Sequence, residues 1–408
     1  MPGSPTTPLL SLCLATYNRA RYLDRYLTHH LTALDAAGVD YELVVSDNCS
    51  TDETPEILAR YAARHARMRV TRQPRNVGAY PNILTTLHAA CGEVVVSIAD
   101  DDLAVFPQIL DYAQRMVADP GLVMIQAPWL LTDETKDNAV IGKFYDFEGE
   151  WRFETGQYGN CLAFVIQNHV FPECWLLRRS ALASIAGPIP RFTYSFFNML
   201  AHALGKGAVL FCPEPHIAAT AITKGGAQVG NSEAMESWDT YRGGLELFAS
   251  YARQFNPGAL PDPVALGGVI QGFVNKRMAA AAKLQVHARN WSNAYQLLRR
   301  LHAYELTPQI GVDHDDVARL AAIETAFVEC SQLGASEIVV ATSVPEYILM
   351  NPIEGARMIR LDAISADDVR RAYCTFGETP DISMRPQDIS CDILQVMERF
   401  PIFPAATA

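Results

Sequence analysis

The amino-acid sequence predicts an α/β fold, in which a mostly parallel sheet flanked by helices is followed by a helical region and a small mixed α/β tail. Between residue 9 and about residue 127, short apolar runs typical of strands alternate with segments of helical periodicity. Residues 232–332 carry helical periodicity with almost no strand pattern, and strand-like runs return after residue 336. Because helical crossovers join parallel strands, the alternating region predicts a mostly parallel sheet.

This alternating region predicts strands and helices in turn. Its apolar runs predict the strands Leu9–Ala15, Glu42–Ser46, Met68–Thr71, Val94–Ile98 and Leu122–Ala127. Its segments with helical spacing predict the helices Tyr22–Ala36, Pro55–Ala62, Pro81–Ala90 and Pro107–Ala118. Ligands of parallel sheets bind beyond the carboxyl ends of the strands, so the loops after Ala15, Ser46 and Ile98 are the candidate site.

Beyond residue 128 the alternation weakens. The sequence there predicts an apolar strand at Leu162–Val170, a short helix at Phe196–Leu204 and a strand at Ala208–Cys212. Helices follow at Met278–Leu284, at Ala294–Leu301 and from Asp313 to Cys330, then strands at Glu337–Thr342 and Met358–Leu361, and a short helix capped by Ser365. We expect three regions with the boundaries 8–230, 231–334 and 335–408.

The composition excludes several classes of protein. The 33 Lys and Arg residues against 45 Asp and Glu give a formal charge of −12, and no basic block occurs, so we expect neither a nucleic-acid nor an anionic-membrane partner. The sequence contains no run of about 18 apolar residues, so it predicts no membrane-spanning helix. The nine cysteines are odd in number and contain no C-x-x-C pair. This pattern favours free thiols and a cytoplasmic location.

Polar residues cluster in the loops that follow the predicted strands. The motifs are Ala15-Thr16-Tyr17-Asn18-Arg19, Ser46-Asp47-Asn48-Cys49-Ser50-Thr51-Asp52, Asn76-Val77-Gly78 and Ala99-Asp100-Asp101-Asp102. Three consecutive carboxylates repel one another unless cations or hydrogen-bond donors compensate them. A divalent ion that bridges two phosphates is the natural compensation, and an N-terminal cap for the helix at Pro107 is the alternative.

Together these motifs resemble the nucleotide-binding half of a family 2 glycosyltransferase of the GT-A fold, the inverting class that uses nucleoside-diphosphate sugars. The resemblance covers residues 8–127 well and reaches about residue 220 in outline. It implies a nucleotide-sugar site that begins at Ala15, with Tyr17 stacked on the base and Asp47 accepting the ring N–H of uracil or thymine. The alternative for residues 47–52 is an Asx turn that caps the next helix, and we assign that capping role to Ser50–Asp52 alone.

The resemblance also implies roles for the acidic cluster and the loop at residue 76. Asp102 is the metal-contacting position, for Mg²⁺ or Mn²⁺, and Asp100 or Asp101 faces the ribose and the sugar. Asn76 and Gly78 fit a tight loop that lets the backbone approach the nucleotide, or else an ordinary turn.

Two departures from the family pattern affect the acceptor side. Family members carry an acidic pair, one member of which is the general base, about ten residues before a helix-ending glycine. Here that glycine is Gly205, and the corresponding residues 192–196 contain no carboxylate. The nearest candidates for the base are His169 and Glu173, with a structural role as the alternative for each. The second departure is Lys224, on a Gly-flanked loop where relatives often place a His; it either neutralises the leaving diphosphate or lies on a flexible surface loop.

The sequence therefore predicts a metal-dependent inverting glycosyltransferase, for hexose or deoxyhexose, that moves a sugar from a UDP or dTDP donor to a hydroxyl of a soluble or lipid-linked small molecule or a glycan. The alternatives are a non-catalytic nucleotide-sugar-binding protein and a sugar-phosphate nucleotidyltransferase. The usual motifs of dinucleotide oxidoreductases, P-loop NTPases, zincins and α/β-hydrolases are absent. The sequence does not determine the oligomeric state, and a homo-oligomer is one of the states compatible with it.

Overall fold

The structure is a computed structural model. It describes residues 7–182, 193–224 and 231–332, together with short segments at 337–340, 358–360, 371–375, 389–392, 395–396 and 398–401. The chain divides into two compact units, of which the first contains Met1–Gly230 and Asp239–Phe273 and the second contains Asn231–Trp238 and Val274–Ala408. The three expected regions stay a prediction.

An eight-stranded sheet forms the centre of the first unit. In spatial order its strands are β3 (Met68–Arg72), β2 (Tyr41–Asp47), β1 (Leu10–Thr16), β4 (Val94–Ser97), β10 (Leu176–Arg178), β6 (Leu122–Gln126), β11 (Ala208–Phe211) and β9 (Trp151–Phe153). Strand β10 runs antiparallel to β4 and β6, β9 runs antiparallel to β11, and the remaining pairs are parallel. The prediction of a mostly parallel sheet is confirmed.

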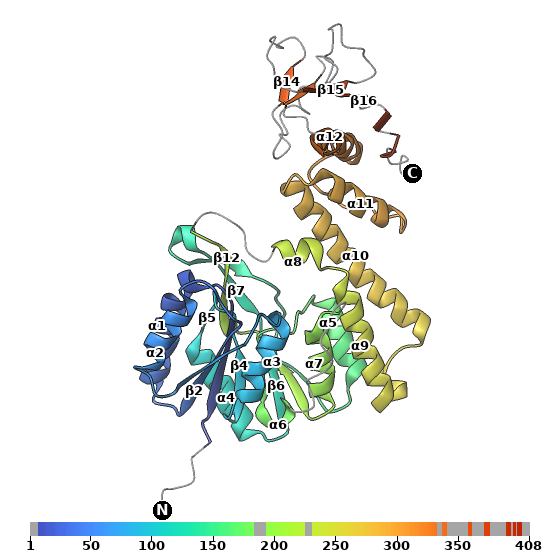
Figure 1. Ribbon diagram of the computed structural model, residues 1–408. Helices are drawn as coiled ribbons and strands as arrows, with labels where there is room; N and C mark the ends of the chain where they lie inside the picture. The colour runs from blue at the N-terminus through green and yellow to red at the C-terminus, as the bar shows by residue number, and fades with distance from the viewer. Residues whose placement is uncertain are drawn as a thin grey trace, which may run out of the picture. The chain divides into compact units, whose positions relative to one another are not determined.

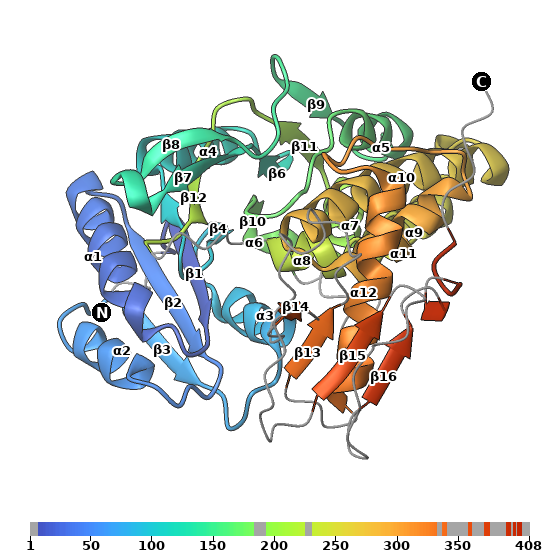
Figure 2. The ribbon, with the colours of Figure 1, turned by 90° about the horizontal axis from the view of Figure 1, so that it is seen from above.

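Helices cover both faces of this sheet. The helices of the first unit are α1 (Ala20–Ala37), α2 (Thr54–Ala62), α3 (Ala79–Ala89), α4 (Phe106–Ala118), α5 (Tyr158–Gln167), α6 (Arg179–Leu182), α7 (Ser195–Leu204) and α9 (Thr240–Phe255), with the 3₁₀ turn η2 (Pro257–Ala259) (Figure 1). Strands β1 and β2 lie between α1 on one side and α3 on the other (Figure 2). Leu23, Leu27, Leu31 and Leu34 of α1 are all buried, as their spacing predicts.

The register of the parallel strands places their loops together. Thr16 of β1 pairs with Asp47 of β2, and Cys13 pairs with Ser97 of β4. Because the strands run in the same direction, the loops after β1, β2 and β4 leave the sheet at one edge.

One predicted element is wrong. Residues 162–170 are not a strand: α5 occupies Tyr158–Gln167. The buried residues Tyr158, Cys161, Leu162 and Val165 recur at intervals of three and four, which is the spacing of a helix. A short apolar run is compatible with either structure, and here the helical spacing extends to residues N-terminal to the run.

A second sheet begins directly after the acidic cluster. Its strands, in spatial order, are β5 (Leu103–Ala104), β12 (Ile217–Ile222), β7 (Trp129–Asp133) and β8 (Ala139–Lys143), and the 3₁₀ turn η1 (Glu134–Lys136) follows β7. These strands are short, and their sequences carry little strand signal. Strand β5 directly follows Asp102 in the chain. Contacts that fix the position of β5 therefore also fix the position of the acidic cluster.

The second unit contains helices and a parallel sheet. Helix α10 (Pro263–His287) passes from the first unit into the second, which also contains α8 (Asn231–Glu236), α11 (Trp291–His302) and α12 (His314–Gln332). Strands β14 (Met358–Arg360), β13 (Glu337–Val340), β15 (Arg371–Thr375) and β16 (Ile389–Asp392) pair in that order and are parallel. The short helix expected after Ser365 lies outside the described residues. None of the helices in the described ranges has the length and apolar character needed to cross a membrane.

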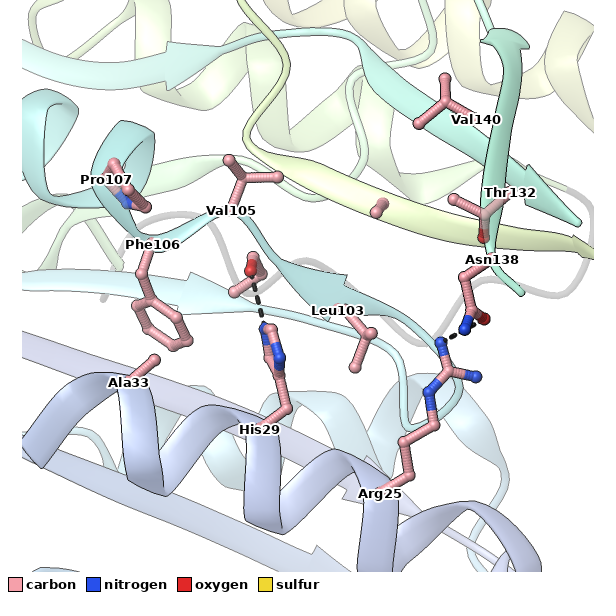
Figure 3. A pocket seen from close by; sticks show the side chains of 12 residues that line it. Arg25, His29, Ala33, Leu103, Val105, Phe106, Pro107, Thr132, Asn138 and Val140 are labelled. Atoms are coloured by element: carbon pink, nitrogen blue, oxygen red, sulfur yellow. Dashed lines mark hydrogen bonds between the residues drawn. The ribbon is translucent and has the colours of Figure 1, made fainter. Parts of the chain in front are cut away.

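Two adjacent histidines of α1 hold strand β5 by its backbone. His29 Nε2–H donates to the carbonyl oxygen of Ala104 (3.0 Å), beside a pocket of about 390 Å³ (Figure 3). The N–H of Ala104 donates to His30 Nε2 (3.1 Å), and His30 Nδ1–H donates to the carbonyl oxygen of Tyr26 (2.7 Å). Both bonds of His30 need a neutral ring, and burial lowers its pKa to about 3.

We predict that His30 makes folding sensitive to acid. The histidine of the unfolded chain binds a proton below about pH 6.5 while the folded one stays neutral, so the free energy of unfolding falls from pH 6.5 toward pH 3, by about 2 kcal/mol at pH 5. His30→Leu removes two hydrogen bonds and costs about 1–3 kcal/mol at pH 7.5, and its unfolding free energy then depends less on pH. Urea unfolding at pH 7.5 and pH 5 measures both effects. The exposed His88→Leu is the control, and an identical pH dependence in His30→Leu and wild type would refute the assignment.

Candidate active site

Two neighbouring pockets lie at the edge where β1, β2 and β4 end. The larger, of about 420 Å³, is lined by Ala15, Thr16, Tyr17, Arg19, Asn48, Asn76, Gly78, Ala79, Asn82, Ile83 and Asp100. The smaller, of about 180 Å³, is lined by Ala15, Ile83, Ser97, Ile98, Ala99, Asp100, Glu173, Cys174, Trp175 and Phe196. Ala15, Ile83 and Asp100 border both, so a ligand can extend from one pocket into the other.

Asn48 shapes the loop that borders the larger pocket. Its Oδ1 accepts from the N–H of Val77 (2.9 Å), and its Nδ2 donates to Asn76 Oδ1 (3.0 Å) and to the carbonyl oxygen of Gly78 (3.2 Å). Gly78 has φ +93°, a conformation that residues with a side chain rarely adopt. The loop therefore has a specific shape, and both predicted residues of this loop, Asn76 and Gly78, line the pocket.

Tyr17 and Asp47 differ in their access to this pocket. The side chain of Tyr17 is on its border and is 41% exposed, as a stacking platform requires. Asp47 is buried, and its Oδ1 accepts from the N–H of Ser50 (2.9 Å). Its Oδ2 lies 3.4 Å from Arg72 Nε in an ion pair and accepts no hydrogen bond. This oxygen is buried, and Asp47 is not among the residues that line either pocket.

The loops after β1 and β2 are joined through hydrogen bonds. Ser50 Oγ accepts from the N–H of Asn18 (2.9 Å), and Asn18 Oδ1 accepts from the N–H of Thr51 (2.8 Å). Asp52 accepts from the N–H of Thr54 (3.0 Å) and from the N–H of Ala20 (3.1 Å). The first bond is the local capping contact expected for Ser50–Asp52, and the second satisfies the first N–H of α1.

Asp100 lies where the two pockets meet. Its Oδ2 accepts from Thr16 Oγ1 (2.7 Å), and its Oδ1 pairs with Arg19 Nε (3.2 Å). Burial raises the pKa of Asp100 to about 6, against the lowering effects of the Thr16 hydroxyl and the Arg19 guanidinium. The Asp101 carboxylate adds to the rise.

Thr220 of β12 holds the other two acidic residues. Its N–H donates to Asp102 Oδ1 (3.2 Å), and its hydroxyl donates to the carbonyl oxygen of Asp101 (3.0 Å). Burial, together with the Asp101 carboxylate, raises the pKa of Asp102 well above its usual range. Helix α4 begins after Val105 with no side-chain cap, so the acidic residues do not serve as its N-terminal cap.

The cluster fits a divalent metal only if other ligands contribute. In the described part of the chain, no group of three or more His, Cys, Asp or Glu side chains is arranged to hold a metal ion. Carboxylates whose pKa values are raised by burial and mutual repulsion would gain from a nearby cation. Mg²⁺ and Mn²⁺ accept one or two carboxylates with phosphate oxygens completing the shell, and this donor set is compatible with that arrangement.

The smaller pocket contains the carboxylate of Glu173. The hydroxyl of Tyr194 donates to Glu173 Oε1, and Phe196 and Trp175 supply apolar walls. Tyr194 and Phe196 belong to the stretch where the family's acidic pair was expected. This stretch therefore brings no carboxylate of its own, but it binds one from residue 173.

Five predicted site residues line neither pocket: Asp47, Asp101 and Asp102, each within two residues of one that does, and His169 and Lys224, which lie apart. His169 is in neither lining, and its ring stacks on Phe273 with the ring centroids 5.5 Å apart. Lys224 binds Glu134 Oε2 through its backbone N–H (2.9 Å), and its side chain is exposed. Gly225 and Gly226 lie outside the described residues. The structure thus brings Glu173, but neither His169 nor Lys224, to the acidic cluster.

Sequence reasoning missed three residues that this site uses. The motif around Arg19 gave no role to this residue, although Arg19 pairs with Asp100 and is the one basic residue among the described residues that line the two pockets. Tyr194 gave no signal, because its partner Glu173 is distant in the sequence. Thr220 gave none either, since its contact with Asp102 depends on pairing in the second sheet.

Comparison with known proteins agrees with these observations. Residues 11–185 match the family model described as glycosyl transferase family 2. Residues 11–185 therefore resemble a family 2 glycosyltransferase domain. The α/β fold class and the family resemblance are both confirmed, while the roles of individual residues stay predictions.

Relatives of known name match parts of the chain. An uncharacterized protein of Mycobacterium tuberculosis is 26% identical over 54% of this chain and 71% of its own length. The abequosyltransferase RfbV of Salmonella typhimurium is 30% identical over 31% of this chain and 42% of its own length, so the match spans less than half of that relative. The solved structure of TarS 1–349 from S. aureus in complex with UDP-GlcNAc is 16% identical, with a TM-score of 0.48 over 77% of this chain and 85% of its own.

We predict that Asn48 keeps the loop at residues 76–78 closed. Asn48→Ala removes three hydrogen bonds, so the Val77 amide loses its acceptor and exchanges with solvent faster. The cost in unfolding free energy is about 1–3 kcal/mol. Hydrogen exchange measures the effect, with the amides of Leu43 and Val45 in β2 as internal controls. Unchanged protection at Val77 would show that the loop keeps its shape without Asn48.

Proposed function

We propose that this protein is an inverting glycosyltransferase that moves a sugar from a UDP or dTDP donor to an acceptor hydroxyl of a small molecule or glycan. One observation carries the proposal: Asp100, the first of the three acidic residues, lines both a pocket suited to a nucleoside and the adjoining pocket that contains the carboxylate of Glu173. A direct displacement needs the leaving group and the base on opposite sides of the anomeric carbon, and two adjoining pockets provide that arrangement.

The larger pocket is the proposed donor site. The exposed ring of Tyr17 offers a face for the base, and the backbone of Gly78 allows close approach. Asp47 Oδ2, which accepts no hydrogen bond, is the proposed acceptor for the ring N–H of uracil or thymine. Such an acceptor distinguishes these bases from cytosine, whose ring nitrogen at that position has no hydrogen.

Asp102 is the proposed ligand of Mg²⁺ or Mn²⁺, with Asp100 and Asp101 toward the ribose and the sugar. A divalent ion, when bound, offsets the negative charge of the departing diphosphate. The residues of the chain position this charge: Thr220 fixes Asp101 and Asp102, and Thr16 fixes Asp100. These contacts come from β1 and β12, so the cluster keeps its geometry without the ligand.

Glu173 is the proposed general base. Its carboxylate lines the smaller pocket, where an acceptor hydroxyl would lie, and takes the proton of that hydroxyl as the new bond forms. The hydroxyl of Tyr194 donates to Oε1 of Glu173, and this hydrogen bond sets the direction in which the carboxylate points. His169 remains the second candidate, and its position outside both linings favours Glu173.

Cysteine chemistry supports a reducing compartment such as the cytoplasm for this reaction. The six cysteines from Cys13 to Cys212 are all free thiols. Cys174 lines the smaller pocket, and burial together with the Asp102 and Glu173 carboxylates raises its pKa. The thiol therefore stays protonated and leaves proton transfer to Glu173.

We predict that UDP or dTDP with Mn²⁺ raises the melting temperature and that Asp102 is needed for the metal-dependent part. A ligand that binds only the folded state adds about 2.7 kcal/mol at a hundredfold excess over its Kd. Asp102→Ala should lose the additional shift that Mn²⁺ gives, whereas Asp111→Ala, an exposed acid of α4, should keep it. Equal shifts in wild type and Asp102→Ala would place the metal elsewhere.

We predict that Glu173→Gln lowers kcat by about 10²–10⁴ while UDP affinity stays within a few fold, because the carboxamide cannot take the proton. Tyr194→Phe should lower kcat less, because the carboxylate stays but loses its orientation. Turnover with paired donors and acceptors, and calorimetric affinity for UDP, measure the two effects, with the exposed Glu148→Gln as the control. Wild-type turnover in Glu173→Gln, together with a loss in His169→Asn, would transfer the role to His169. A wild type that binds nucleotide and forms no glycoside would favour the non-catalytic alternative.

A further inference from the structure

The linings of the two pockets contain one basic residue and two acidic residues. Among the described residues that line them, Arg19 is the only basic one, whereas Asp100 and Glu173 are acidic. The Arg19 guanidinium lies 3.2 Å from Asp100 Oδ1 through Nε and 4.0 Å from Asp101 Oδ2 through Nη2. A nucleoside diphosphate bound in the larger pocket would bring further negative charge close to Arg19. Its phosphate oxygens would then compete with the carboxylates of Asp100 and Asp101 for the guanidinium.

The backbone of Arg19 is held firmly. Its N–H donates to Thr54 Oγ1 (3.0 Å), and the neighbouring amides of Asn18 and Ala20 donate to Ser50 Oγ (2.9 Å) and Asp52 Oδ2 (3.1 Å). Three consecutive amides are thus tied to the loop after β2. The starting point of the side chain is therefore fixed relative to the larger pocket.

The side chain of Arg19 is the exposed partner in these ion pairs. It is 40% exposed, whereas the side chains of Asp100 and Asp101 are 8% and 12% exposed. Asp100 is also held by Thr16, and Asp101 by Thr220 through its carbonyl oxygen. If one partner of these ion pairs moves when a ligand enters, we expect it to be the guanidinium. The two carboxylates are nearly buried, and that of Asp100 is held by Thr16, whereas the Arg19 side chain is largely in contact with solvent.

We propose that Arg19 binds the diphosphate of the donor, and that its guanidinium exchanges between the Asp100–Asp101 carboxylates and the phosphate oxygens. This inference rests on the proposed function, in which the donor is a nucleoside-diphosphate sugar. A planar guanidinium binds carboxylate and phosphate oxygens with the same fork of N–H groups, so one oxyanion replaces another. Asp100 keeps the hydrogen bond from Thr16, and a divalent ion bound near Asp102 would supply the positive charge that Arg19 withdraws.

The role proposed for Arg19 is the one that the sequence suggested for Lys224. Lys224 lies two residues beyond the end of β12, and its backbone N–H donates to Glu134 Oε2. Arg19 borders the donor pocket itself. The cation that stabilises the leaving group is therefore assigned to the first βα loop, two residues after the proposed base-stacking Tyr17.

The test separates the diphosphate from the nucleoside. Affinities of wild type, Arg19→Gln and Arg19→Lys are measured by calorimetry for uridine and UDP, and for thymidine and dTDP, all with Mg²⁺. Loss of charge-assisted hydrogen bonds should weaken the diphosphates about 10- to 100-fold in Arg19→Gln and leave the nucleosides unchanged. Arg19→Lys should recover part of the loss, because it keeps the charge without the fork. Arg21→Gln, two residues away and outside both linings, is the matched control and should behave as wild type.

Each outcome decides the inference. An unchanged ratio of diphosphate to nucleoside affinity in Arg19→Gln overturns it, including the case in which both ligands weaken equally through a distorted pocket. A change in affinity for Mg²⁺ alone, with that ratio unchanged, shows that Arg19 only balances the charge of the carboxylates, and also overturns it. Failure of the wild type to bind either nucleotide of the two pairs is a different result: it refutes the proposed donor class, and with it the ligand assigned to Arg19.

Discussion

Compensation of the charge on Asp100, Asp101 and Asp102 is the constraint on which the rest of the site depends. Three adjacent carboxylates at the end of a buried strand repel one another, and burial together with the Asp101 carboxylate raises the pKa of Asp100 and Asp102. Thr16 and Arg19 bind the carboxylate of Asp100, and the N–H of Thr220 donates to the carboxylate of Asp102. These partners come from β1, from the loop that follows it, and from β12, so the cluster joins both sheets of the first unit.

The histidine pair of α1 extends this support. His29 and His30 bind both backbone groups of Ala104, two residues after Asp102. The acidic loop is thereby held at its far end by a helix whose own start is tied to the loop after β2 through Asp52. The loops after β1 and β2 and the acidic cluster are therefore joined in one network of hydrogen bonds. This network explains how a site made mostly of loops keeps its shape.

Local patterns in the sequence were enough to predict which loops border the larger pocket. Strands β1, β2 and β4 are continuous apolar runs, and their parallel arrangement follows from the helices between them, so the meeting of Tyr17, Asn76 and Asp100 could be inferred. Such patterns do not reveal contacts between residues distant in the chain. The bond from Tyr194 to Glu173 joins residues that follow different elements, and the segment before Glu173 is a helix that a short apolar run did not distinguish from a strand.

The direction of β10 determines how the two halves of the site meet. Leu176 of β10 pairs with Val96 of β4 in antiparallel register, so the residues that precede β10 lie at the edge where β4 ends. Glu173, three residues before Leu176, is thereby carried toward Ala99, which begins the acidic motif. The spacing between the proposed base and the acidic cluster is then a property of strand register: a slip of two residues would shift Glu173 by roughly 6–7 Å along the sheet. Loops that flank the smaller pocket can therefore vary in length and sequence while the distance from Glu173 to the acidic cluster stays constant.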